Sequence, residues 1–151
     1  MFNHAVVIDD DPINNFLCEK VLGSSESVKR ITTFENPEIA FKYLQENINT
    51  SDFPDLVLLD LNMPKLDGWG FLEKFKTLPS HIIENTKLYI LTSSVDEGDK
   101  RKAQKSENVS GFVQKPLSVD NVKKFGSFNR FNRFMPLLAF GFLLDFFGLI
   151  V

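Results

Sequence analysis

The chain has 151 residues, which is enough for one compact domain with a buried core. Its formal net charge of −3 at pH 7 argues against nucleic acid as the main partner, because phosphate groups are bound by basic surfaces. The single cysteine, Cys18, excludes an internal disulfide, and no signal peptide is evident at the start, so we expect a cytoplasmic protein.

Short β-branched runs alternate with amphipathic segments along residues 1–125, a pattern typical of parallel α/β sheets. Strands are predicted over 4–9, 28–34, 55–60, 87–92 and 111–115. Helices are predicted over 11–23, 36–48, 67–78, 95–106 and 118–125, of which 95–106 is very polar and poorly anchored. We expect a doubly wound, five-stranded parallel sheet with right-handed crossovers and helices on both faces.

The first helix is predicted in more detail. Asp11 fits an N-cap better than a metal ligand, Pro12 suits the first helical position, and Gly23 ends the helix. The buried face is predicted to consist of Ile13, Phe16, Leu17 and Val21.

Chemically active side chains follow four of the five predicted strands. Asp9 and Asp10 end the first strand and Asp60 ends the third. Thr92 ends the fourth and Lys115 follows the fifth. The carboxyl ends of parallel strands form one edge of a sheet, where ligands bind, so these side chains should meet there.

Three carboxylates at one edge repel one another unless a cation lies between them. Mg²⁺ fits, because it prefers carboxylate oxygens, waters and a phosphate oxygen. Asp60 could act as a nucleophile and form an aspartyl phosphate. Lys115 could then neutralise the phosphoryl oxygens, and the Thr92 hydroxyl could donate a hydrogen bond to one of them.

Four segments, "VVIDDDP", "DLVLLDLNMPKLDGWGFL", "LYILTSS" and "GFVQKPL", resemble the signatures of response-regulator receiver domains of the stand-alone type. The resemblance covers about residues 3–125 and implies a flavodoxin-like strand order of 2-1-3-4-5. It also implies that Asp60 is the phosphoacceptor and that Asp9, Asp10, Asp60 and the Asn62 carbonyl hold Mg²⁺.

The same resemblance assigns further roles. Thr92 is the switch hydroxyl, and Phe112 is the aromatic that moves inward when Thr92 is drawn to the phosphate. Lys115 contacts the phosphate and precedes a cis peptide bond to Pro116, in line with the rule that cis bonds precede proline. Asn62 and Ser94 occupy positions that tune the lifetime of the phosphorylated state.

Several of these residues also have purely structural interpretations. Ser93 replaces Thr92 as the switch if the register shifts by one, and Phe112 could belong only to the core. Structural roles are predicted for four further residues: packing for Trp69, core filling for Cys18, helix capping for Asp67 and close packing for Gly68. The two histidines, His4 and His81, lie far apart without cysteine partners, so we expect surface histidines and no zinc site.

The resemblance implies a partner that donates phosphate, either a sensor histidine kinase or a histidine phosphotransfer protein. Phosphorylation would then change the surface formed by 95–106, 111–115 and 118–125, which docks a downstream protein. One alternative is a receiver that binds partners without phosphate turnover. The other is a phosphatase of the haloacid-dehalogenase type, which Asn62 disfavours because that family has an acidic aspartate two residues after the nucleophile.

Composition changes beyond residue 125. Eight of the 16 phenylalanines fall within 125–151, and the only charges after Phe125 are Arg130, Arg133 and Asp145. We therefore divide the chain into a receiver domain, 1–125, and a Phe-rich hydrophobic tail, 126–151. The tail is interpreted first as a packing or dimerising segment, then as the product of a shifted reading frame, and last as a membrane anchor.

Overall fold

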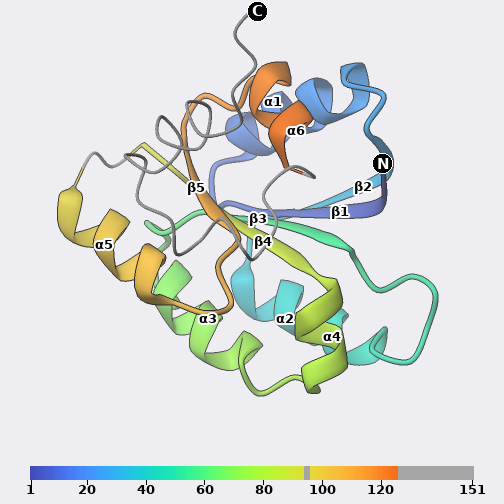
Figure 1. Ribbon diagram of the computed structural model, residues 1–151, viewed down its shortest axis with the longest axis vertical. Helices are drawn as coiled ribbons and strands as arrows, with labels where there is room; N and C mark the ends of the chain where they lie inside the picture. Colours follow the sequence, from blue (N-terminus) through green and yellow to red (C-terminus); the bar gives the residue numbers. More distant parts are fainter. Residues whose placement is uncertain (94–95, 126–151) are drawn as a thin grey trace, which may run out of the picture.

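The computed structural model describes residues 1–93 and 96–125 (Figure 1). Its five strands are β1 (Phe2–Ile8), β2 (Val28–Phe34), β3 (Leu56–Leu59), β4 (Lys87–Thr92) and β5 (Gly111–Gln114). Its helices are α1 (Pro12–Ser24), α2 (Pro37–Glu46), α3 (Gly68–Phe75), α4 (Ser80–Asn85), α5 (Glu97–Lys105) and α6 (Val119–Lys124). All strand pairs are parallel in the order β2-β1-β3-β4-β5, which confirms the predicted topology.

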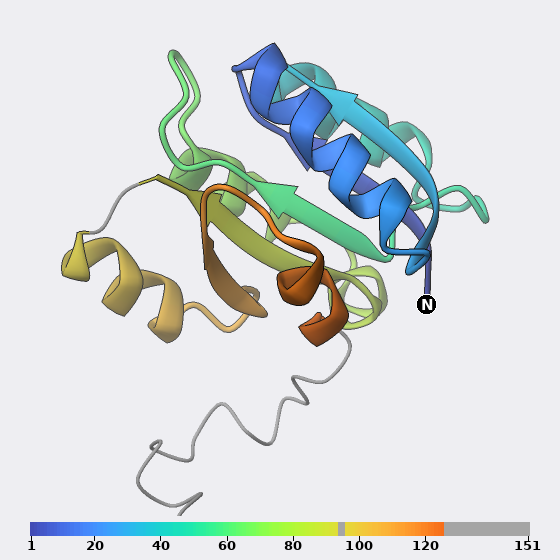
Figure 2. The same cartoon turned by 90° about the horizontal axis from the view of Figure 1, so that it is seen from above.

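Helices cover both faces of the sheet (Figures 1 and 2). In β1, Val6 and Ile8 pack in the cluster beneath α2, α3 and α5, whereas Ala5 and Val7 pack in the cluster beneath α1 and α6. This period of two is the one a strand imposes, and burial on both faces explains why the strands are apolar almost throughout.

The buried face of α1 differs from the prediction. Ile13, Phe16 and Leu17 are exposed, by 67%, 56% and 47% respectively. The face that packs on the sheet carries Asn15, Cys18 and Leu22, and of the predicted residues only Val21 packs partly against this core. Apolar side chains occur on two sides of this helix, so periodicity alone did not select the correct one. Cys18 fills the core as predicted.

Helix α4 was not predicted. Its six residues form about two turns and bury no side chain completely, so they give no clear apolar period. Ile82 and Ile83 pack partly against the core, which is what holds this segment beneath β4.

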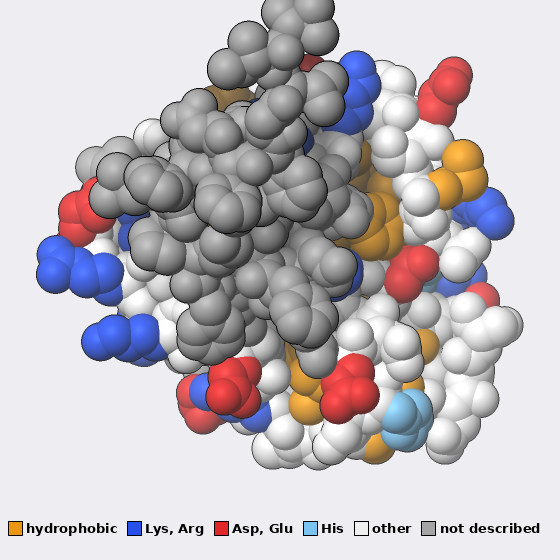
Figure 3. Space-filling model, viewed as in Figure 1, with side chains coloured by type: hydrophobic (Ala, Val, Ile, Leu, Met, Phe, Trp, Pro, Cys, Tyr) orange, Lys and Arg blue, Asp and Glu red, His pale blue; other side chains and the backbone are white. Residues whose placement is uncertain are grey.

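Helix α5 is polar, as predicted, and Ala103 is its only buried residue. Lys102 of this helix also contacts α3, because its Nζ lies 4.1 Å from the centroid of the Trp69 ring. Trp69 also packs on the core, so the predicted packing role is confirmed. Figure 3, in the same view as Figure 1, shows Lys and Arg side chains at the left of the molecule, where α5 lies.

His4 is buried, at 2% exposure, so the prediction of a surface histidine was wrong for it, although His81 is exposed. The His4 Nε2 lies 2.9 Å from Thr32 Oγ1. Its Nδ1 lies 2.8 Å from the Asp52 carbonyl oxygen and 2.9 Å from Arg30 Nη2. In a neutral ring, Nδ1 either donates to the Asp52 carbonyl or accepts from Arg30, and Nε2 takes the opposite role toward the Thr32 hydroxyl. These partners join β1, β2 and the loop before β3. A lone histidine in a strand gives no sequence signal for such a network.

Within residues 1–93 and 96–125, no helix is both long and apolar enough to cross a membrane. The predicted tail, 126–151, lies outside the described residues.

The burial of His4 predicts acid-sensitive stability. Burial lowers the pKa of His4 below its ordinary 6.5, although the Asp52 carbonyl opposes the shift. The folded state therefore binds fewer protons than the unfolded state below about pH 6.5, and the free energy of unfolding should fall there by up to about 1.4 kcal/mol per pH unit.

Urea unfolding between pH 5 and 7.5 measures this slope for wild type, His4→Gln and His81→Gln. We expect His4→Gln to flatten the slope and the exposed control, His81→Gln, to keep it. Equal slopes in wild type and His4→Gln would contradict the account.

Candidate functional site

The backbone itself places the predicted site residues at one edge of the sheet. Asp9, Asp60 and Lys115 each directly follow a strand, and their amides continue the ladder of hydrogen bonds. The Asp9 N–H donates to Phe34 O at 3.0 Å, and the Asp60 N–H donates to Ile8 O at 2.9 Å. The Lys115 N–H likewise donates to Thr92 O at 2.9 Å. The side chains are therefore fixed by the sheet rather than by free loops.

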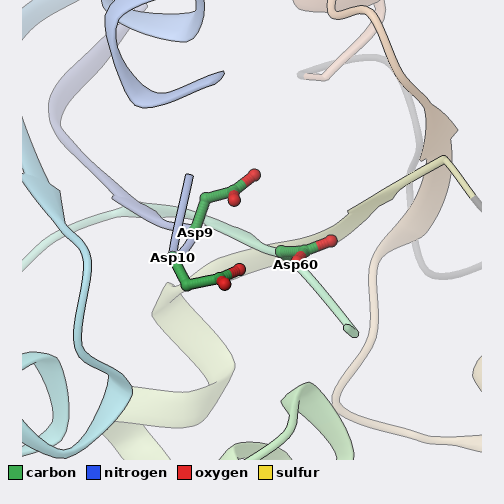
Figure 4. Close-up of side chains that lie close together, drawn as sticks. All are labelled: Asp9, Asp10 and Asp60. Carbon is green, nitrogen blue, oxygen red and sulfur yellow. The ribbon is translucent and has the colours of Figure 1, made fainter. Parts of the chain in front are cut away.

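Three carboxylates converge at this edge, from the loops after β1 and β3 (Figure 4). One oxygen of each of Asp9, Asp10 and Asp60 lies within 4.8 Å of the others, close enough to share a metal ion. Asp9 and Asp60 are buried, and Asp10 is exposed. Hard carboxylate oxygens with one side open to water fit a divalent cation such as Mg²⁺.

Lys115 links the two buried carboxylates. Its Nζ lies 2.5 Å from Asp9 Oδ2 and 3.1 Å from Asp60 Oδ1. Burial raises the pKa of Asp9, and the hydrogen bond from Lys115 opposes this rise. Burial alone would lower the pKa of Lys115, but its hydrogen bond to Asp9 and the charges of Asp9 and Asp60 outweigh that effect and raise it. The lysine therefore stays protonated and lies within reach of an anion at Asp60.

Asn15 is a site residue that the sequence analysis missed. Its buried amide donates to Asp9 O at 2.8 Å and to Phe34 O at 3.3 Å, which ties α1 to the ends of β1 and β2. Asp11 caps α1 as predicted, since its Oδ1 accepts from the Ile13 N–H at 2.9 Å. The spacing of Asn15 with Cys18 and Leu22 was the signal that could have revealed the inward face.

Gly68 holds α3 against the end of β3, as predicted. A Cβ at this position would lie 2.4 Å from the Asp60 carbonyl oxygen and 2.8 Å from Leu61 Cα, both backbone atoms. The Gly68 N–H donates to Leu61 O at 3.0 Å. The predicted cap is also present, because Asp67 Oδ1 accepts from the Gly70 N–H at 2.7 Å. This contact sets the position of the loop that carries Asp60.

The remaining predicted residues surround the carboxylates. Thr92 is fully buried at the end of β4 and pairs with Gln114 in register. Phe112 pairs with Ile90, which lies two residues before Thr92 in β4 and therefore on the same face of the sheet. Phe112 also packs partly against the core. The Lys115–Pro116 bond is cis, as predicted. Asn62 is exposed, and Ser94 lies outside the described residues.

Comparison with known proteins agrees with this geometry. Residues 5–125 match the family described as response regulator receiver domain. The chain belongs to this family. Receiver domains are the phosphoacceptor domains of two-component signalling, so the function class predicted from the sequence is confirmed.

Individual receiver proteins show the same similarity. The probable chemotaxis protein CheY of Rhizobium etli is 28% identical over 120 residues, which span 78% of this chain and 84% of that protein. Some curated relatives are longer, and the chain spans only about half of their length, 51% and 53% in two cases.

Solved receiver structures share the fold. A two-component response regulator from Cytophaga hutchinsonii superposes with a TM-score of 0.79 at 28% identity, covering 83% of this chain and 95% of that one. The Mn²⁺-bound form of response regulator Rcp1 superposes with a TM-score of 0.64 at 25% identity, covering 83% and 90%.

The close approach at Gly68 yields a stability prediction with a matched control. Gly68→Ala should lower the free energy of unfolding by about 1–3 kcal/mol, because its methyl group meets backbone that cannot give way. Gly23 lies within α1, which ends at Ser24 and not at Gly23 as predicted, and an added Cβ would have nothing within 4 Å. Gly23→Ala should therefore raise the free energy of unfolding by about 0.4–1 kcal/mol. Chemical denaturation measures both, and a neutral Gly68→Ala would show that this contact is not tight.

Proposed function

We propose that this receiver domain takes a phosphoryl group onto Asp60 from a phosphohistidine of a histidine kinase or histidine phosphotransfer protein. The ion pairs of Lys115 with Asp9 and Asp60 carry the proposal, because they bring one cation and two buried carboxylates to the end of β3. Lys115 carries one positive charge against the three carboxylates of Asp9, Asp10 and Asp60, so the cluster stays negative and attracts a divalent cation beside the strand-end aspartate.

An Asp60 carboxylate oxygen attacks phosphorus, a P–O bond forms, and the P–N bond to the donor histidine breaks. The electron pair of that bond stays on the imidazole nitrogen. Lys115 neutralises charge on the equatorial oxygens, as phosphoryl transfer requires. We propose that Thr92, at the end of β4, donates its hydroxyl to the phosphoryl group. Phe112, the proposed switch aromatic, lies diagonally from Thr92 on the same face of the sheet.

The residues fit a magnesium ion held by Asp9, Asp10 and Asp60, with the exposed Asn62 supplying its carbonyl. When bound, the ion supplies charge neutralisation for the incoming phosphoryl oxygens. The Mn²⁺-bound form of the related regulator Rcp1 supports a divalent-cation site in this family. In the structure, Lys115 pairs with Asp9 and Asp60, and Asp10 is exposed to water.

Downstream, we propose that phosphorylation changes the surface formed by α5, β5 and α6, which then docks a protein partner. Helix α5 buries only Ala103, and this limited burial favours a change in this element, since switching elements come from the less stable parts of a fold. Asn62 and Ser94 are proposed to tune the lifetime of the phosphorylated state.

Phosphoryl uptake is tested directly by intact mass after incubation with acetyl phosphate. Wild type should gain one phosphoryl group only when Mg²⁺ is present, and Asp60→Asn should gain none. Asp67→Asn is the matched control, because it removes a nearby carboxylate while an asparagine still caps α3. It should be labelled like wild type.

Uptake that persists in Asp60→Asn would place the phosphoacceptor elsewhere. The absence of uptake by wild type at any Mg²⁺ concentration would favour the alternative of a receiver that binds partners without phosphate turnover.

Metal binding is tested with neighbouring charge-neutralising variants. Asp10→Asn should weaken Mg²⁺ binding by roughly tenfold or more, because it removes a charged ligand. Its free energy of unfolding should stay constant or rise, since repulsion within the cluster decreases. Asp11→Asn loses the same charge one residue away but keeps the cap of α1, so its Mg²⁺ affinity should stay near that of wild type.

Isothermal titration calorimetry and urea unfolding provide the two readouts. Equal loss of affinity in both variants would mean that net charge, not ligation by Asp10, governs binding. Unfolding of Asp10→Asn would mean that the cluster is structural.

A further inference from the structure

Helix α1 carries an exposed apolar face. Ile13, Phe16 and Leu17, here called the α1 patch, lie within one turn of the helix and are 67%, 56% and 47% exposed. Elsewhere among the described residues, large hydrophobic side chains this exposed are single, at Met1 and Ile39. Such a cluster on a helix marks a surface that is covered by something.

We propose that residues 126–151 of the same chain pack against the α1 patch. This proposal goes beyond the phosphoryl chemistry and does not depend on it. It rests on where the described chain ends, on how far the next residues reach, and on the chemistry that the two surfaces share.

The described chain ends beside α1. Helices α1 and α6 lie next to each other on one face of the sheet (Figures 1 and 2). Phe125, after α6, is buried in the same cluster as Cys18 and Leu22 of α1. Its ring lies 4.2 Å from that of Tyr89, centroid to centroid, and its carbonyl accepts from the Tyr89 hydroxyl at 2.7 Å. Residue 126 therefore starts from a fixed point next to α1.

The patch is within easy reach of that point. Leu22 and Ile13 are separated along α1 by about 14 Å, from the rise of 1.5 Å per residue. Because Ile13 faces away from the buried Leu22, the chain must also pass about halfway around a helix that is about 10 Å wide. An extended chain covers about 3.3 Å per residue, so about seven residues are enough to span the whole path. Phe128, Phe131 and Phe134 follow Phe125 by three, six and nine residues.

The chemistry of the segment complements that of the patch. In "FNRFNRF", residues 128–134, a phenylalanine recurs every third residue, and Arg130 and Arg133 lie between them. Asp10 and Asp11, directly before α1, offer opposite charge beside the patch. Phenylalanines packed on the patch would leave these arginines free to approach the two carboxylates.

The segment is also favoured over a second copy of the chain. A tethered segment presents itself to the patch at an effective concentration of about millimolar, which exceeds that of separate molecules in dilute solution.

Limited trypsin digestion of the full chain tests the proposal, because Arg130 and Arg133 are the only trypsin sites in the segment. Ile13→Ser combined with Phe16→Ser should speed cleavage at these sites by about tenfold, since cleavage follows the population of the undocked state. Ile39→Ser is the matched control, because Ile39 is 58% exposed on α2, across the sheet. It should leave the rate unchanged.

Equal rates of cleavage at Arg130 and Arg133 in all variants would overturn the proposal, and so would equal acceleration in the Ile39→Ser control. A wild-type cleavage rate that decreases as protein concentration rises would also overturn it, because that result indicates that a second copy of the chain covers the patch. Phe128→Ser combined with Phe131→Ser should reproduce the acceleration from the other side of the contact. Fragment masses separate these cuts from those within 1–125, whose unchanged rate shows an intact fold. Asp60 takes no part in this readout, so the result stands whether or not phosphoryl uptake is found.

Discussion

Lys115 between Asp9 and Asp60 is the interaction on which the functional edge of this receiver depends. Two buried carboxylates would be costly without a compensating cation, and a buried lysine would be costly without them. The cluster nevertheless keeps a negative charge, because Asp10 adds a third carboxylate on the side that is open to water. The edge is thus balanced for its own structure and still electrostatically favourable for a divalent cation.

The rest of the fold serves to place these groups. Asp9, Asp60 and Lys115 are each the first residue beyond a strand, and the amide of each makes one more interstrand hydrogen bond, so strand register sets the spacing of their charges. Asn15 clamps the ends of β1 and β2 from one face, and Gly68 lets α3 approach Asp60 from the other. Helices on both faces of the sheet therefore converge on the same few backbone positions.

The parallel sheet and the meeting of the candidate site residues at one edge could be predicted from strand ends, whereas the strand order came from the resemblance to receiver domains. Apolar runs locate the strands, parallel order brings their carboxyl ends together, and Asp9, Asp60 and Lys115 follow directly. The sequence was insufficient where a polar side chain packs inward. Asn15 makes the inner face of α1 partly polar, so the more apolar face appeared to be the buried one. The inward position of His4 depends on partners 26 to 48 residues away, at Arg30 and Asp52, which no local pattern reveals.

The central claim is that Asp9, Asp10 and Asp60 together form a divalent-cation site. It is tested most directly by crystals of the full chain soaked with Mn²⁺, which takes the same oxygen ligands as Mg²⁺ and can be located by anomalous scattering. The account predicts one anomalous peak in contact with all three carboxylates, with Lys115 still beside Asp60. A peak elsewhere, or none at this edge at saturating Mn²⁺, would contradict it.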